Sequence, residues 1–253
     1  MSSDVDLTRA LSFGATAEEY DRVRPSYPAE LIDDLVALRP ARVLDVGSGT
    51  GKAAELLVAR GLDVLAVEAD ARMAAIVERK GIAVEVSPFQ DWDARGRVFD
   101  LITAGQSWHW MPQPVSDRRA FALLRAGGHL AAFWNLGMLD ERAMAALDAV
   151  YAVHAPALAE GSRQLADLVD EHRCLADSLA PAGFGPVELR TYPGSATYTA
   201  REFVDLIATH SNHATLPAAQ REAVLRAVED AIAALGGTVI EQTCTALILA
   251  ARH

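Results

Sequence analysis

Cysteine is scarce in this chain of 253 residues, since only Cys174 and Cys244 occur and they lie far apart in the sequence. Two cysteines support no disulfide framework, and their spacing matches no pattern of zinc ligands. We therefore expect reduced thiols, as in a cytoplasmic protein, and no bound metal.

Long apolar runs and dense basic runs are also missing. No apolar stretch reaches the roughly 18 residues of a membrane-spanning helix, and the first residues lack the basic and apolar pattern of an export signal. Acidic residues outnumber basic ones by 34 to 23, which gives a formal net charge of -11. Because such a surface repels phosphate backbones and anionic lipid, we expect neither a nucleic-acid partner nor a membrane partner.

From Arg42 onward the chain alternates short apolar runs with longer helix-like segments. This alternation is typical of βαβ units in a parallel sheet. We expect an α/β fold with a doubly wound, seven-stranded, mostly parallel sheet of Rossmann-like type, in a single domain covering 1–253. The predicted strands cover residues 42–46, 63–68, 82–86, 98–104, 129–134, 187–192 and 245–251.

Two segments interrupt this alternation with helix-like patterns. Residues 138–170 contain no strand pattern, and Pro156 and Gly161 break them into pieces. Residues 199–236 contain two further helical stretches, near 200–209 and 217–235. We expect both segments to form a helical cap on the substrate side, over the sheet edge where ligands bind in such folds.

Three glycines follow the first predicted strand in the segment VLDVGSGTGK, residues 43–52. Glycines at such a turn let the backbone bend sharply and approach a ligand closely. A dinucleotide fingerprint would need glycine where Lys52 stands, which weakens a nicotinamide interpretation. A phosphate-binding loop would need glycine at Val46 and serine or threonine at Ala53, so that interpretation fails at two positions.

An acid lies at the end of each of the first two predicted strands. Asp45 precedes the glycines, and Glu68 follows about 20 residues further on, a spacing found in nucleotide-binding βαβ units. Each feature also has a purely structural alternative, because a glycine turn can be a tight connection and an acid can cap a turn. The combination of both acids with the glycines favours a ligand site.

VLDVGSGTGK followed by VLAVEAD (64–70) is similar to the first two motifs of class I S-adenosylmethionine-dependent methyltransferases. FGATAEEYDRVRPSYP (13–28), SPFQDW (87–92) and AGQSWHW (104–110) resemble a small-molecule branch of that family, related to the trans-aconitate and quinone-pathway enzymes. The implied cofactor is S-adenosylmethionine. Its ammonium group suits Asp45, directly or through water, and its two ribose hydroxyls suit the Glu68 carboxylate.

The resemblance also implies where other residues meet this cofactor. Tyr20 and Arg24 would close over its amino-acid end, so residues 1–30 would form an N-terminal lid that orders on binding. Gln90 stands where relatives often have an acid, but it still offers adenine a donor and an acceptor. The remaining implied contacts are Gly47, Ser48, Gly49 and Thr50 with the methionine part, Glu68 and Ala69 with the ribose and adenosine, Phe89 and Gln90 with the adenine edge, and Gln106 beside the sulfonium.

The acceptor side carries weaker signals. Trp108, His109 and Trp110 follow the fourth predicted strand, where this fold places functional loops. His109 is either a general base for a hydroxyl or acidic carbon, or a wall residue of the pocket, and both interpretations stay open. His210 and His213 are equally open, although a metal site there would need a third ligand that the neighbouring sequence lacks.

Three hypotheses for the function follow. The first is in-line transfer of a methyl group to oxygen or carbon of a small molecule with an apolar or acidic group. The second is a non-catalytic S-adenosylmethionine-binding regulatory protein, and the third is the weakened nicotinamide-dependent oxidoreductase. The Asn/Asp-Pro-Pro-aromatic turn of base-methylating enzymes is replaced by residues 104–107 here, which disfavours nucleic-acid methylation. We expect a monomer or homodimer.

Overall fold

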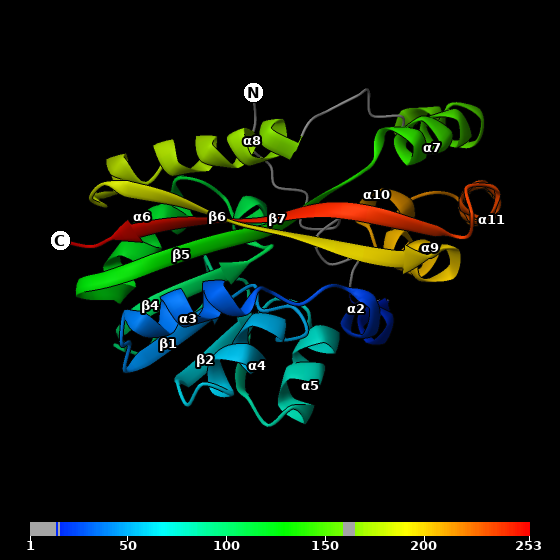
Figure 1. Ribbon diagram of the computed structural model, residues 1–253. Helices are drawn as coiled ribbons and strands as arrows, with labels where there is room; N and C mark the ends of the chain where they lie inside the picture. Colours follow the sequence, from blue (N-terminus) through cyan, green and yellow to red (C-terminus); the bar gives the residue numbers. More distant parts are fainter. Residues whose placement is uncertain (1–13, 15, 159–164) are drawn as a thin grey trace.

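The computed structural model of the chain describes residues 14, 16–158 and 165–253. At its centre is a seven-stranded sheet in the order β3–β2–β1–β4–β5–β7–β6. Neighbouring strands are parallel except for β7, which runs antiparallel to both β5 and β6. The expected α/β fold with a doubly wound, mostly parallel sheet is confirmed (Figure 1).

The first four strands form the parallel half of the sheet. They are short runs of mostly apolar residues, and each begins and ends within one residue of its predicted range. They are β1 (Arg42–Val46), β2 (Asp63–Glu68), β3 (Ala83–Val86) and β4 (Phe99–Gly105). Strands β1, β2 and β4 are largely buried, as expected inside a parallel sheet, whereas β3 lies at the edge and is partly exposed.

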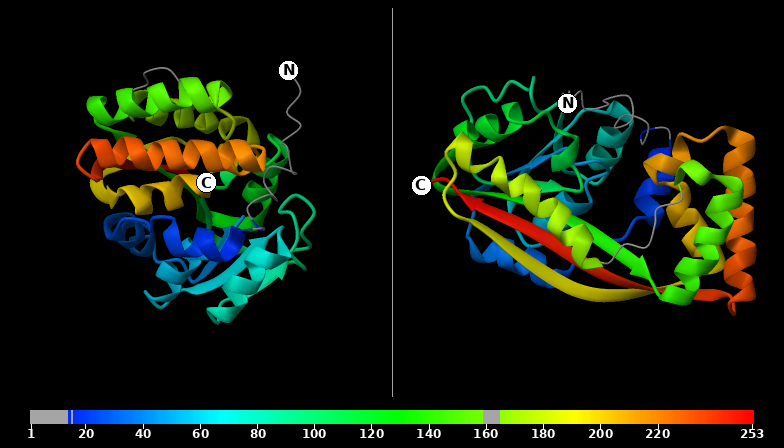
Figure 2. Two further views of the ribbon diagram at one scale, coloured as in Figure 1. Left: turned by 90° about the vertical axis from the view of Figure 1, so that its right-hand side faces the viewer. Right: turned by 90° about the horizontal axis from the view of Figure 1, so that it is seen from above.

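The last three strands are longer than predicted. They are β5 (Leu124–Leu139), β6 (Val187–Thr199) and β7 (Thr238–Ala251). Their additional residues carry no continuous apolar run, because much of the added length lies on a partly exposed ribbon. This ribbon extends beyond the parallel half of the sheet and ends at the cap (Figure 2). The prediction that a helical segment starts at residue 138 is therefore wrong at its beginning, because Met138 and Leu139 belong to β5 and the helix begins at Glu141.

Helices cover both faces of the sheet. On one face lie α3 (Ala29–Ala37), α4 (Lys52–Val58) and α5 (Ala71–Arg79), and on the other α6 (Val115–Leu123) and α8 (Leu165–Asp177) (Figure 1). Each face has its own buried apolar cluster against the strands. None of the described helices is both long and apolar enough to cross a membrane.

A group of helices gathers at the far end of the long strands and forms the cap (Figure 2). It has a separate apolar core that includes Leu147, Phe203, Val228 and Ile232. The helices near 200–209 and 217–235 are confirmed within about a residue. Residues 159–164 of the predicted cap lie outside the described chain. Residues 165–170 were also predicted in the cap, but they belong to α8 and pack against the core of the sheet. The cap consists of α7 (Glu141–His154), η3 (Pro156–Leu158), α9 (Ala200–Ala208), α10 (Ser211–Ala214) and α11 (Ala218–Ala234).

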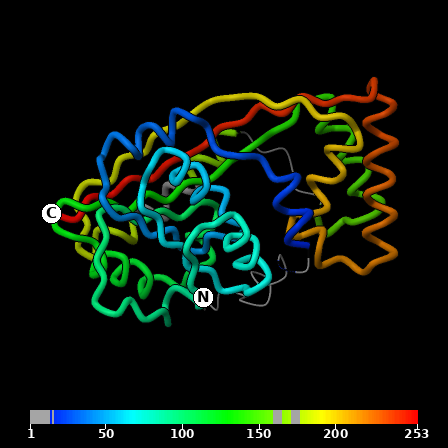
Figure 3. The backbone as a smooth tube through the Cα atoms, turned by 90° about the horizontal axis from the view of Figure 1, so that it is seen from below, coloured from blue at the N-terminus to red at the C-terminus, as the bar shows by residue number. Residues whose placement is uncertain are grey.

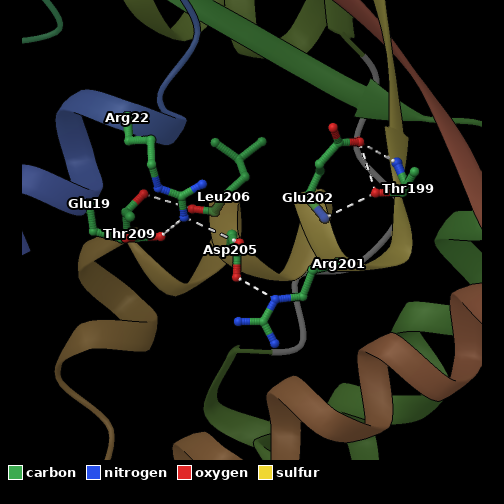
Figure 4. A network of polar contacts seen from close by, with 8 residues as sticks. All are labelled: Glu19, Arg22, Thr199, Arg201, Glu202, Asp205, Leu206 and Thr209. Carbon is green, nitrogen blue, oxygen red and sulfur yellow. Dashed lines mark hydrogen bonds and ion pairs between the residues drawn. The ribbon is translucent and has the colours of Figure 1, made fainter.

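Helix α2 (Ala17–Val23) lies between α5 and the cap helix α9 (Figure 3). On the α5 side, Lys80 forms a 2.8 Å ion pair with Asp21. On the α9 side, Arg22 forms a 3.3 Å ion pair with Asp205 (Figure 4). Helix α9 itself starts at a capping box in which Thr199 and Glu202 bond reciprocally. Residues 1–13 and 15 of the expected lid lie outside the described chain.

Candidate functional site

A cavity of about 370 Å³ opens at the carboxyl ends of β1, β2 and β4, and α2 and α10 contribute to its walls. We call it the cofactor cavity. Its wall residues are separated by up to 192 positions in the sequence, from Tyr20 to Asn212, and the fold brings them together. Every site residue proposed from the sequence lines it: Tyr20, Arg24, Asp45, Gly47, Ser48, Gly49, Thr50, Glu68, Ala69, Phe89, Gln90, Gln106 and His109. Their contacts with a ligand stay predictions.

The glycine turn after β1 needs its glycines for two reasons. Gly47 and Gly49 have φ angles of 59° and 56°, in the left-handed region that side chains disfavour. A Cβ atom on Gly47 would also lie only 2.7 Å from the Cβ of Ser107. The N–H of Gly47 donates to the carbonyl of Val67 at 2.8 Å, which ties the turn to the end of β2.

Glu68 holds this turn as well as lining the cavity. Its carboxylate is 8% exposed and accepts hydrogen bonds from the N–H groups of Gly49 at 2.7 Å and Asp70 at 2.9 Å. Burial raises the pKa of Glu68. Each carboxylate oxygen has a second lone-pair site, so these bonds leave room for the ribose hydroxyls proposed from the sequence. The role of Glu68 in the turn itself was not foreseen.

Asp45 is fully buried at the end of β1. Its Oδ1 accepts a hydrogen bond from the hydroxyl of Thr103 at 2.7 Å. Burial, reinforced by the nearby charge of Glu68, raises the pKa of Asp45 to about 7. A cation bound beside Asp45 would favour the charged carboxylate and lower this pKa again.

Three buried oxygens around the turn have no hydrogen-bond partner among the described residues: Asp45 Oδ2, Ser48 Oγ and Thr50 Oγ1. Burying such a group without a partner costs about 1–3 kcal/mol. All three residues line the cofactor cavity, so a ligand rich in N–H and O–H donors at this turn would offset that cost. The walls therefore fit the ammonium and hydroxyl groups of S-adenosylmethionine.

Arg24, at the end of α2, brings a positive charge to one side of the cavity. Its guanidinium lies 5.1 Å from the ring centre of Tyr20 and donates to the Thr209 hydroxyl at 2.9 Å and to the Thr209 carbonyl at 3.0 Å. No carboxylate contributes to the electrostatics of Arg24 within the described chain. Its charge is thus available to a carboxylate of a bound ligand.

Gln106 and His109 lie on the side of the cavity after β4. Gln106 has a φ of 58°, unusual for a residue with a side chain, and its Nε2 donates to the carbonyl of Asn135 at 3.0 Å. The indole N–H of Trp134 donates to Nδ1 of His109 at 2.9 Å. Because an indole nitrogen can only donate, the neutral His109 ring carries its proton on Nε2. This bond weighs against His109 as a base and favours its role in the wall.

The sequence predicted a cap over the ligand-binding edge and left the role of His210 open, but it did not assign any cap residue to the cofactor cavity. His210, Ser211 and Asn212 line the cofactor cavity, and no local pattern indicates this. Burial holds the pKa of His210 well below its usual value, so its ring is neutral. His213 lies behind it, with Nε2 3.0 Å from the Tyr151 hydroxyl. No group of three or more potential metal ligands occurs in the described residues.

Comparison with known proteins agrees with this geometry. Residues 20–155 match the family described as "Methyltransferase domain". An uncharacterized methyltransferase of Mycobacterium tuberculosis is 40% identical over 141 residues, 53% of this chain and 55% of that protein. A trans-aconitate 2-methyltransferase of Variovorax paradoxus is 35% identical over 118 residues, 45% of each chain. The chain spans about half the length of the curated relatives it matches.

A solved structure shows the same fold. Phosphoethanolamine N-methyltransferase 2 of Haemonchus contortus, in complex with phosphomonomethylethanolamine and S-adenosylhomocysteine, superposes with a TM-score of 0.54 and 13% identity. The match covers 94% of this chain and 57% of that one. The resemblance to class I methyltransferases noted in the sequence therefore extends to the fold.

We expect Gly47→Ala to destabilise the chain more than Gly61→Ala does. Both glycines have positive φ angles, but a Cβ on Gly61 meets nothing within 4 Å, whereas on Gly47 it meets Ser107. Gly61→Ala should cost about 1–2 kcal/mol from backbone strain alone, and Gly47→Ala should cost about 1–3 kcal/mol more. Urea denaturation measures both. Equal losses would contradict the close packing of the turn.

Proposed function

The chain belongs to the methyltransferase domain family, and we propose that it transfers a methyl group from S-adenosylmethionine to oxygen or carbon of a small molecule. The observation that carries this proposal is the set of unpartnered buried oxygens of Asp45, Ser48 and Thr50 beside the glycine turn. They lie in one cavity with Glu68 and Arg24, so acceptors and a cation are arranged for an amino acid joined to a nucleoside.

Each of these residues would bind a different group of the cofactor. Asp45 would receive the ammonium group, Arg24 the carboxylate and Glu68 the ribose hydroxyls. Phe89 and Gln90 would hold the adenine edge. Phe89 is 4% exposed, and its ring centre lies 6.2 Å from that of Trp108. In this arrangement the pKa of Asp45 falls as its partner binds, because a cation favours the ionised carboxylate.

S-adenosylmethionine, when bound, supplies a methyl group on a positively charged sulfur that a nucleophile can displace. The protein supplies alignment and exclusion of water, which can account for several kcal/mol of the barrier. Gln106, fixed by its bond to Asn135, would form the floor beside the reacting centre. His109 would present its Nε2–H, and the neutral His210 would accept a hydrogen bond from an acceptor hydroxyl.

Two measurements test this function. Calorimetry should detect binding of S-adenosylhomocysteine and no binding of NAD, and NAD binding alone would contradict the cofactor assignment. Incubation with S-adenosylmethionine labelled at the methyl group and a metabolite extract should then yield labelled small molecules. Cofactor binding without any labelled product would instead favour the non-catalytic, regulatory alternative.

We expect His109→Ala to lower kcat less than about tenfold, rather than the 100-fold or more typical of a lost general base. The reason is that Trp134 already donates to Nδ1. Trp134→Phe serves as the matched control, because it removes this donor and lets Nδ1 accept a proton. A fall of 100-fold or more for His109→Ala, with unchanged affinity for S-adenosylhomocysteine, would restore His109 as the base.

A further inference from the structure

A second cavity of about 540 Å³ adjoins the cofactor cavity and is lined by the long strands, α9 and the segment after α2. We call it the acceptor cavity. It shares wall residues with the cofactor cavity, among them Arg24, Gln106 and His210. A third cavity of about 230 Å³ continues from it among the cap helices. His210 lines all three, so it marks the point where they meet.

Glu241 of β7 lines both the acceptor cavity and the third cavity. In the sheet it lies opposite Leu139 of β5 and Ala196 of β6. Its carboxylate occupies the space over Gly137, where an added Cβ would be 2.3 Å from Glu241 Oε1. The Tyr198 hydroxyl faces this carboxylate and acts to lower the pKa of Glu241, against the larger effect of burial. Glycine at position 137 therefore makes room for a carboxylate inside the cavity.

No ion pair joins Glu241 to a lysine, arginine or histidine among the described residues, although its side chain lies in the walls of two cavities. Burial raises the pKa of Glu241, and a cationic partner would offset the cost of burying its charge. Arg24 and Lys52, the cations of the acceptor cavity, are shared with the cofactor cavity. The third cavity adds only one more charged side chain, the acidic Asp148, among its described walls.

The walls of the third cavity are largely apolar, whereas those of the acceptor cavity mix apolar side chains with hydroxyl and amide groups along their length. Leucine, isoleucine, methionine and phenylalanine side chains supply much of the apolar surface. They are Leu136, Phe203, Leu206 and Ile207 in the acceptor cavity, and Met138, Leu139, Met144, Leu147, Leu158 and Leu168 in the third cavity. An apolar ligand body gains free energy by leaving water for such walls.

Glu241 is distant from the end where methyl transfer would occur. That end is marked by Asn135 and Thr245, whose side chains form a 2.7 Å hydrogen bond, and Gln106 donates to the Asn135 carbonyl. Glu241 precedes Thr245 by four residues in β7, and a strand rises by 3.2–3.4 Å per residue, so they are about 13 Å apart along the strand. A group on Glu241 is thus separated from the reacting atom by most of the cavity.

We propose that the methyl acceptor is a largely apolar molecule with an ammonium group at one end, and that Glu241 binds this ammonium group while the other end reaches the cofactor. The inference rests on the proposed function, since it concerns the acceptor of the same reaction. The sequence left open whether the acceptor carries an apolar or an acidic group, and this inference favours the apolar one. Glu241 and Asp148 repel an acidic group at the far end of the cavity and attract a cation.

Three probes with the same eight-carbon chain test this inference: n-octylamine, 1-octanol and n-octanoate. Each is titrated at pH 7.5 into the full chain saturated with S-adenosylhomocysteine, and calorimetry gives the affinity. Octylamine should bind at least about tenfold more tightly than octanol, because a buried charge pair adds to the same apolar contact, and octanoate should bind most weakly.

The variant Glu241→Gln should lower the affinity for octylamine by about tenfold and leave that for octanol within twofold. Glu222→Gln is the matched control, because Glu222 pairs with Arg226 on an exposed face of α11 and is 71% exposed. It should change neither affinity. Should Glu241→Gln fail to fold, judged by its melting temperature, the ranking of the three probes on the wild-type chain decides alone.

The affinity for S-adenosylhomocysteine, measured first, separates the failure of this inference from the failure of the proposed function. If S-adenosylhomocysteine does not bind, the proposed function fails. If it binds but octanol or octanoate binds as tightly as octylamine, only the acceptor assignment is overturned. The same holds if Glu241→Gln keeps the full preference for the amine.

Discussion

The buried carboxylates of Asp45 and Glu68, at the ends of neighbouring strands, set the constraint on which the site depends. Burial raises the pKa of both, and the charge of Glu68 adds to the effect on Asp45. Glu68 is stabilised by the N–H groups of the glycine turn and of Asp70, so the turn has its shape before any ligand arrives. Asp45 keeps one buried oxygen without a hydrogen-bond partner, and a cationic ligand would offset the free-energy cost of burying it. Preorganised acceptors of this kind favour binding because they need little rearrangement.

The antiparallel strand β7 contributes walls to the acceptor cavity beside the cofactor cavity. It lies between β5 and β6, and all three continue past the parallel half of the sheet to the separate core of the cap. Helix α2 packs between α5 and α9, with ion pairs on both sides that are partly exposed and contribute little individually. The cofactor cavity and the acceptor cavity therefore share walls from both halves, and His210 from the cap reaches the cofactor side.

The cofactor half was predictable because its signals are local. The glycines at 47 and 49 follow an apolar strand, and Glu68 ends the next strand, so two short motifs indicate one sheet edge. The acceptor half depends on pairing between distant segments. Glu241 is one acid in a strand of alternating polar residues, and its burial follows from the register that sets it beside Gly137, more than 100 residues earlier. The role of His210 stayed open in the sequence, since only the docking of α9 and α10 brings it to the cavity.

The central claim, that Asp45 receives the ammonium group of the cofactor, is tested most directly by titrating S-adenosylhomocysteine at pH 6 and pH 7.5 into the wild type and Asp45→Asn. With a pKa of about 7 in the empty cavity, Asp45 is mostly protonated at pH 6 and must lose its proton to pair with a cation. The account predicts that wild-type affinity rises about fivefold to tenfold between these pH values, while Asp45→Asn binds more weakly and equally at both. A wild-type affinity that does not change with pH, or an Asp45→Asn variant that binds as tightly as the wild type, would contradict it.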